Sequence, residues 1–163
     1  MPALRANQRS GDQTESSRLN LGALKRGLLT FWAAWTGLVF ASNAADGLKR
    51  MRVLPESWVF ASRNYNLMMK VTATYYAPEW MVAALFFGVI GWQAAGTWSY
   101  SRASMRPSVG GGILLAFGIN LALWAAFMIA DEVFLAYPME NVHRAVFTAQ
   151  LLTLIAVWLL PER

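Results

Sequence analysis

Four long stretches of the chain carry no charged side chain, while the segments between them are polar or charged. The stretches cover residues 27–45, 80–101, 107–130 and 145–161. Each is close to the roughly 17 to 25 residues that an α-helix needs to cross the hydrocarbon core of a bilayer. Their apolar character is continuous rather than alternating, which favours helices over membrane β-strands. The pattern predicts an all-α integral membrane protein with four transmembrane helices in an antiparallel bundle.

The bounds of the predicted elements follow from the polar residues that flank these stretches. We expect spans at about residues 25–46, 78–101, 108–131 and 141–160. They form a single domain, residues 21–163, behind a polar tail, residues 1–20, which has too few large apolar side chains to fold alone. A cleaved signal peptide is the alternative for the first stretch, since small residues occur near its end, but the long polar lead before Gly27 favours a retained span.

The longest connection, between the first two spans, has a helical pattern of its own at about residues 56–74. Aromatic and other side chains recur there at spacings of three and four residues, namely Trp58, Ala61, Tyr65, Met68 and Thr72. This spacing predicts an amphipathic interfacial helix. It either lies in the plane of the outer leaflet or caps the bundle by packing on the spans, and we favour the cap.

Composition narrows the class and the location. Hydrophobic residues make up 56% of the chain and charged residues only 14%, which suits a helical membrane protein rather than a soluble domain. The absence of cysteine excludes disulfides, thiolate catalysis and iron–sulfur clusters. The basic residues lie beside the spans, so we interpret the net charge of +5 as a topology signal and expect no nucleic-acid partner.

The charges divide unequally between the two faces that four spans would create. The face with both termini has eight Lys or Arg residues against three acidic residues, while the opposite face has six against six. Because basic residues favour the cytoplasmic side, we expect both termini in the cytoplasm. We place the protein in the cytoplasmic (inner) membrane of a bacterium.

Small residues recur along the spans at helical spacing. The stripes are Ala33, Gly37, Ala41 and Ala45; Ala84, Gly88, Gly91 and Ala95; Gly118, Ala122, Ala126 and Ala130; and Ala145, Ala149, Thr153 and Ala156. Small residues let membrane helices approach closely. We therefore expect these faces to pack the spans together, or to contact other subunits or a second copy of the chain.

One helical face of the third span carries polar and aromatic residues. Asn120, Trp124, Phe127 and Asp131 follow one another at spacings of three and four residues. Such a face lines a polar path toward the outer surface, or Asn120 forms an interhelical hydrogen bond, and we favour the hydrogen bond. His143, Trp124 and Asn120 are the candidate cofactor-binding residues.

A possible metal site lies at the turn before the fourth span. Glu140 and His143, the only histidine, have the E-x-x-H spacing that places both side chains on one helix face, and Asp131 and Glu132 add carboxylates. These four residues are the candidate metal ligands. The alternative is a solvated loop whose acidic residues stabilise the N-terminus of the following helix, and we favour this alternative over a metal site.

His143 is also the one axial ligand available for a haem or chlorophyll-type pigment. The sequence requires no cofactor.

No charged residue lies inside the four stretches, which disfavours an ion or proton pathway, and no G-x-S-x-G elbow is present. We therefore expect a non-catalytic structural or accessory subunit of a larger, energy-transducing membrane complex, with the bilayer and other subunits as partners. One alternative is a small membrane enzyme or a metal- or ligand-binding protein that uses Asp131, Glu132, Glu140 and His143. Another is a self-associating bundle that binds lipid, quinone or pigment.

Overall fold

The computed structural model describes residues 2–106 and 111–160, with side chains from residue 21 onward. Its elements are α1 (Pro2–Arg50), α2 (Asn64–Thr72), the 3-10 turn η1 (Ala73–Tyr75), α3 (Glu79–Met105), α4 (Gly111–Val133) and α5 (Tyr137–Leu159). No strand occurs among these residues. Four helices are long and apolar enough to cross a membrane: Leu21–Arg50 of α1, and α3, α4 and α5. They indicate the all-helical integral membrane protein that the sequence predicts.

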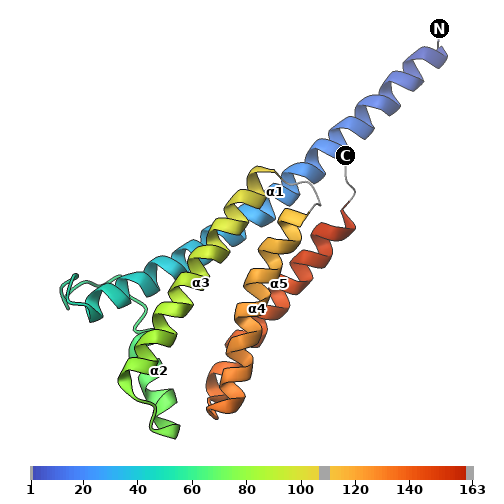
Figure 1. Cartoon of the computed structure of the whole chain (residues 1–163). Coiled ribbons are helices and arrows are strands. Elements are labelled where there is room, and N and C mark those ends of the chain that lie inside the picture. The colour runs from blue at the N-terminus through green and yellow to red at the C-terminus, as the bar shows by residue number, and fades with distance from the viewer. Residues whose placement is uncertain (1, 107–110, 161–163) are drawn as a thin grey trace.

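The long helices have a definite order of close neighbours. α1 packs along α3, α3 packs on its other side against α4, and α4 packs against α5 (Figure 1). α2 lies against α1 and α3. The four helices converge at the end near the chain termini, whereas α4 and α5 stand apart from α2 and α3 at the opposite end (Figure 1). The two ends therefore differ in how tightly the helices meet.

Several element bounds differ from those predicted. Helix α1 begins at Pro2, so the backbone of residues 2–20 is helical where we expected a tail with no fold of its own. Its Ala, Leu, Arg and Gln residues are good helix formers that continue the helix beyond the other elements (Figure 1). Residues 107–110, where the third span was expected to begin, lie outside the described residues, as do 161–163.

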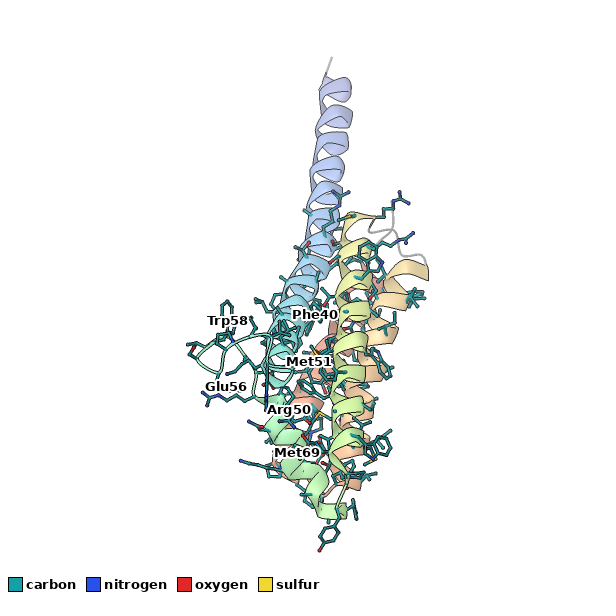
Figure 2. All side chains as sticks on the ribbon, turned by 60° about the vertical axis from the view of Figure 1, so that its left-hand side comes forward. Phe40, Arg50, Met51, Glu56, Trp58 and Met69 are labelled. Carbon is teal, nitrogen blue, oxygen red and sulfur yellow. The ribbon has the colours of Figure 1, made fainter. Side chains whose placement is uncertain are left out.

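The amphipathic helix is shorter than predicted. Residues 51–63 are irregular, so Trp58 and Ala61 lie outside any helix. Positive φ angles at Arg52 and Arg63 break the helical path, and the Lys49 ammonium donates to the carbonyl oxygens of Glu56 and Trp58 at 2.8 and 3.3 Å. Figure 2 shows this loop, with Glu56 and Trp58, projecting to one side of α1. The spacing from Trp58 to Ala61 was thus not a helical signal.

The start of α2 is set by a carboxylate from another helix. Asp46 of α1 accepts hydrogen bonds from the Tyr65 backbone N–H at 2.9 Å and from the Ser62 hydroxyl at 3.2 Å. An acceptor here satisfies an amide in the first turn of α2 that has no partner within its own helix. Tyr65 and Thr72 are buried, so α2 is docked on its neighbours.

The converging end of the molecule is filled by large side chains from all four long helices. We call this region the closed half, and its buried residues are Leu29, Trp32, Tyr100, Ala103, Ile113, Ala116, Phe117 and Val157. Tyr100 lies at its centre, stacked on Trp32 with ring centroids 6.4 Å apart and edge-on to Phe117 at 5.0 Å. Such contacts hold membrane helices together because lipid provides no hydrophobic drive for their association.

The small-residue stripes of α3 and α4 do not pack the helices together as predicted. A methyl group at Gly88, Gly91 or Gly118 would meet no atom within 4 Å. The close approach of α3 and α4 occurs instead at Gly96, where a methyl group would lie 2.5 Å from Oδ1 of Asn120. The prediction was right in part for α1, since a methyl group at Gly37 would lie in ordinary contact, 3.4 Å from Thr97.

Candidate functional site

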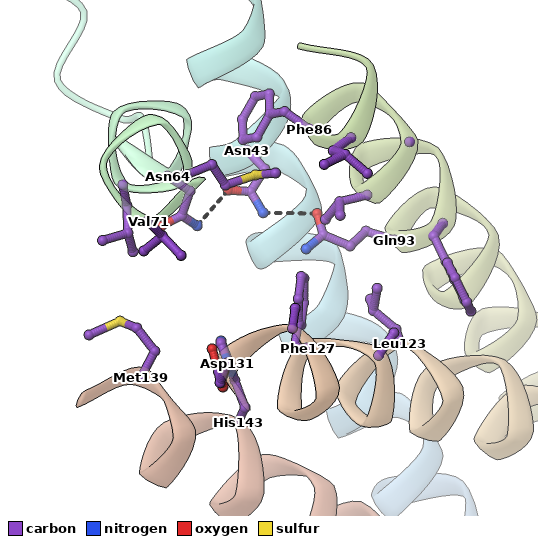
Figure 3. Close-up of a pocket in the computed structure, with 18 of the residues that line it drawn as sticks. Asn43, Asn64, Val71, Phe86, Gln93, Leu123, Phe127, Asp131, Met139 and His143 are labelled. Atoms are coloured by element: carbon purple, nitrogen blue, oxygen red, sulfur yellow. Dashed lines mark hydrogen bonds and ion pairs between the residues drawn. The ribbon is translucent and has the colours of Figure 1, made fainter. Parts of the chain in front are cut away.

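A cavity of about 520 Å³ lies where the helices diverge. All five α-helices contribute to its walls, with α1, α2 and α3 on one side and α4 and α5 on the other (Figure 3). We call this cavity the groove. Tyr75 of η1 and Phe134, the residue directly after α4, form a ring contact with centroids 5.7 Å apart that bridges the two sides of the groove.

Most of the groove is lined by apolar side chains, and small residues account for its width. Ala84 and Gly88 of α3 and Ala126 and Ala130 of α4 are all part of the lining. Members of the predicted packing stripes therefore face a hollow rather than a neighbouring helix. Their lack of side-chain volume leaves the room that forms the groove.

A chain of three amides forms the first polar feature of the lining. Asn64 donates through Nδ2 to Oδ1 of Asn43 at 2.8 Å, and Asn43 donates through Nδ2 to Oε1 of Gln93 at 2.9 Å (Figure 3). Among the described residues, Nε2 of Gln93 has no hydrogen-bond partner, although only 5% of Gln93 is exposed. Figure 3 shows this amide nitrogen on the side of Gln93 that faces the hollow. We call Asn43, Asn64 and Gln93 the amide chain.

A carboxylate and an imidazole form the second polar feature, on the opposite wall. Nδ1 of His143 lies 2.6 Å from Oδ2 of Asp131 (Figure 3). The imidazole stacks on Phe127 with ring centroids 4.9 Å apart and planes 23° from parallel, and Trp124 lies 5.7 Å away. We call Asp131 and His143 the acid–imidazole pair. Its Nδ1 is occupied, and Nε2 of His143 has no partner among residues 2–106 and 111–160.

Local helix structure brings this pair together. Helix α4 continues to Val133, so Asp131, the end of the predicted third span, lies inside its last turn. Helix α5 begins at Tyr137 and has Pro138 in its first turn, a position where the missing N–H is harmless. The backbone N–H of Ala136 donates to the carbonyl oxygen of Asp131 at 2.7 Å, which holds the turn closed.

Among the described residues that line the groove, no side chain other than His143 is basic. Nearby cations are engaged elsewhere: Arg50 forms an ion pair with Glu79 and lies over the ring of Tyr65. Asp131, 5% exposed, is the only carboxylate in the lining. The polar chemistry of the groove is therefore that of amides and the acid–imidazole pair.

The four candidate metal ligands are not all brought together. Glu140 lies 3.3 Å from Arg144 in an ion pair, and Glu132 is exposed. In the part of the chain that the structure describes, no three His, Cys, Asp or Glu side chains gather closely enough to hold a metal ion. Only Asp131 and His143 of the candidate set meet.

The polar face of the third span is divided between two roles. Trp124, Phe127 and Asp131 line the groove. Asn120 does not: its Nδ2 donates to the carbonyl oxygens of Ala116 at 2.8 Å and of Gly96 at 3.4 Å, the latter across to α3. Asn120 is thus the interhelical contact that we favoured.

The amide chain is the part of the site that sequence reasoning missed. Asn43 and Gln93 are recognisable as amides in apolar stretches, and such residues usually have a partner. Asn64 lies in a connection where an amide carries no signal at all. Nothing in the spacing of the three residues indicates that they meet.

Other buried polar atoms lack partners. Within the described residues these are Trp32 Nε1, Thr97 Oγ1, Tyr100 Oη, Trp124 Nε1, and Nε2 and Oε1 of Gln150. Gln150 is completely buried, yet neither of its amide atoms is paired. A buried amide without partners is destabilising by about 1 to 3 kcal/mol.

The chain matches no protein-family model, and no curated protein or solved structure is significantly similar to it. Its own residues therefore provide the basis for a functional proposal, and the groove is the feature that combines volume, apolar surface and inward-facing polar atoms.

Proposed function

We propose that the protein is a non-catalytic membrane protein that binds an amphipathic small molecule from the bilayer in the groove. The observation that best supports this proposal is a largely apolar cavity of about 520 Å³ with polar groups on opposite walls. Small-molecule sites typically measure about 300 to 1,000 Å³ and combine apolar walls with a few placed polar groups. The groove has this composition.

The bilayer is the expected source of the ligand. The groove is built from helices of the type that spans a membrane, so a molecule dissolved in lipid reaches it without crossing water. Its apolar part would lie against side chains such as Val39, Leu123 and Phe127, and its polar part against the amide chain or the acid–imidazole pair. With both termini in the cytoplasm, as we propose, the groove belongs to the outer half of the bundle.

Filling the groove tests this function. The protein is extracted with its surrounding lipid by a membrane-solubilising polymer, and bound small molecules are identified by mass spectrometry. Gly88→Leu places a side chain in the groove at a position where a methyl group meets nothing within 4 Å. We expect this variant to fold normally and to lose at least nine-tenths of the specifically retained molecule.

Gly91→Leu is the matched control, because Gly91 lies on the same helix, is equally unobstructed and does not line the groove. It should retain the molecule at the level of the unmodified protein. Equal retention by both leucine variants, or the absence of any enriched molecule, would contradict the proposal.

A second candidate is the accessory subunit of a larger, energy-transducing membrane complex. Ala145, Ala149 and Ala156 of α5 are exposed, as are Gly118 and Ala122 of α4, so these small residues are not used between the described helices. Such faces favour contact with another membrane helix. Purification in a mild detergent tests this role, and recovery of a stable monomer with no protein partner would argue against it.

A further inference from the structure

We infer that the groove accepts the neutral, ring-shaped head of a quinone-type amphiphile, with one head oxygen at Gln93 and the opposite oxygen at His143. This inference rests on the proposed function and specifies its ligand. It concerns binding only and assigns no electron transfer to the chain.

Charge narrows the class of head. The groove lining contains no Lys or Arg, and it contains the buried carboxylate of Asp131. A phosphate head would therefore enter a site with no cationic partner except the imidazole, beside a group of its own sign, and burial of an unpaired charge is costly. The site favours a head without net charge.

The hydrogen-bonding capacity of the groove narrows the class of head group further. Oε1 of Gln93 already accepts a bond from Asn43, so the atom left for a ligand is the donor Nε2. An amide donor that faces a largely apolar cavity favours a ligand with an acceptor, such as a carbonyl oxygen. Because Gln93 is 95% removed from solvent and turned toward the hollow, this preference applies to the occupant of the groove (Figure 3).

The opposite wall presents a group that pairs with either a donor or an acceptor. With Nδ1 of His143 engaged by Asp131, Nε2 donates when it carries a proton and accepts when it does not. An oxygen that is a carbonyl in one form of the ligand and a hydroxyl in another matches this position. Quinones and quinols have oxygens of this kind at opposite ends of one ring.

The lining between the two polar features suits a flat ring and an apolar tail. Phe127 and the imidazole of His143 are stacked and present planar surfaces, and Trp124 lies beside them. Planar rings favour offset-stacked or edge contacts with one another. Much of the remaining lining consists of Val, Leu, Met and Ala side chains, which suit an alkyl or isoprenoid chain.

The test uses purified protein in discs of a synthetic zwitterionic phospholipid. A photoreactive benzoquinone with a ten-carbon alkyl chain is crosslinked to the protein, and the labelled peptides are mapped by mass spectrometry. Competitors of equal chain length carry an unreactive benzoquinone, a phosphate, a quaternary ammonium or no head group. We expect saturable labelling of the α3 and α4 segments that line the groove, and protection by the benzoquinone only.

Gln93→Met is the decisive variant, because it keeps a side chain of similar length and removes the free donor Nε2 without introducing a carboxyl group that donates when protonated. We expect at least about tenfold weaker competition by the benzoquinone, the loss that follows from removing one buried hydrogen bond. Gln150→Leu, a substitution of the same residue type outside the groove lining, is the control and should leave competition unchanged. His143→Phe preserves a ring that can stack on Phe127 and should also weaken competition.

Failure of the inference and failure of the proposed function give different results. Protection by the phosphate, ammonium or headless compound at the same concentration, together with normal binding to Gln93→Met, would overturn the quinone assignment and leave amphiphile binding in place. No saturable labelling and no protection by any competitor would overturn both.

Discussion

The closed half and the groove are made by the same long helices, yet one end is filled and the other is hollow. Around Tyr100, large rings from α1, α3 and α4 meet face to face and edge to face. Around Gly88 and Ala126, small residues face each other across the groove, and the helices stand apart. The comparison teaches that small residues in membrane helices permit close approach only where a neighbouring element brings the helices together.

Different contacts maintain the two arrangements. The closed half relies on the rings packed around Tyr100. Between it and the groove, α3 meets α4 closely at Gly96, and the Trp92 indole donates to the Ile119 carbonyl oxygen at 2.9 Å.

At the groove, the amide chain ties α1, α2 and α3 together, and the acid–imidazole pair ties α4 to α5. Each wall is therefore internally linked by polar bonds, while ring contacts join the two walls, Tyr75 to Phe134 and Trp35 to Trp124.

Truncating one phenylalanine in each region should produce the largest difference. Phe117→Ala removes a fully buried ring from the closed half and should lower the free energy of unfolding by about 3 to 5 kcal/mol. Phe127→Ala, which enlarges an existing hollow, should lower it by roughly half as much or less. Reversible unfolding in mixed detergent micelles, followed by tryptophan fluorescence, measures both. Equal losses would mean that the groove is as tightly packed as the closed half.

A pair of glycine substitutions in α3 should sharpen the comparison. Gly96→Ala forces its methyl group against Asn120 and should destabilise the protein by about 1 to 3 kcal/mol. Gly91→Ala meets no obstacle and should be neutral or stabilising by up to about 1 kcal/mol, the gain in helix propensity. The same unfolding measurement separates them. A tolerated Gly96→Ala would show that α3 and α4 approach less closely than their contacts indicate.

The smallest effect concerns the unpaired amide of Gln150. Gln150→Leu replaces two buried polar atoms that lack partners by apolar atoms of similar volume, and should stabilise the protein by about 1 kcal/mol. Thermal unfolding in detergent, with Thr153→Val of the same helix as a control, measures the change. Destabilisation by Gln150→Leu would instead reveal a hydrogen-bond partner for this amide in the membrane-embedded protein.

The membrane spans were predictable because the length of a stretch without charged residues is a local property of the sequence. The composition of residues 27–45 and 80–101 predicts membrane-spanning helices whatever the neighbouring elements are. The bounds were less predictable: Glu132 and Pro138 resemble loop residues, but α4 and α5 extend over them. The start of α2 escaped prediction because it depends on Asp46, a residue of another helix.

Half of the candidate site was visible in the sequence. His143, the only histidine, and Asp131 stood out because charged and titratable groups are rare at the ends of membrane helices. Their partners Phe127 and Trp124 followed from helical spacing on one face. The opposite wall did not follow, because Asn43, Asn64 and Gln93 belong to three separate helices and no local pattern connects them.

By itself, the sequence determined a membrane-embedded, all-helical chain without cysteine chemistry, since length, apolarity and composition require no knowledge of neighbours. Only the tertiary structure decided which small residues pack and which leave a hollow, which amides satisfy one another, and that the lining combines an unpaired Gln93 donor with an acid–imidazole pair. The physical reason is that packing and hydrogen bonding are relations between surfaces. A stripe of small residues either packs against a neighbouring helix or lines a cavity, and the distance to that helix decides which.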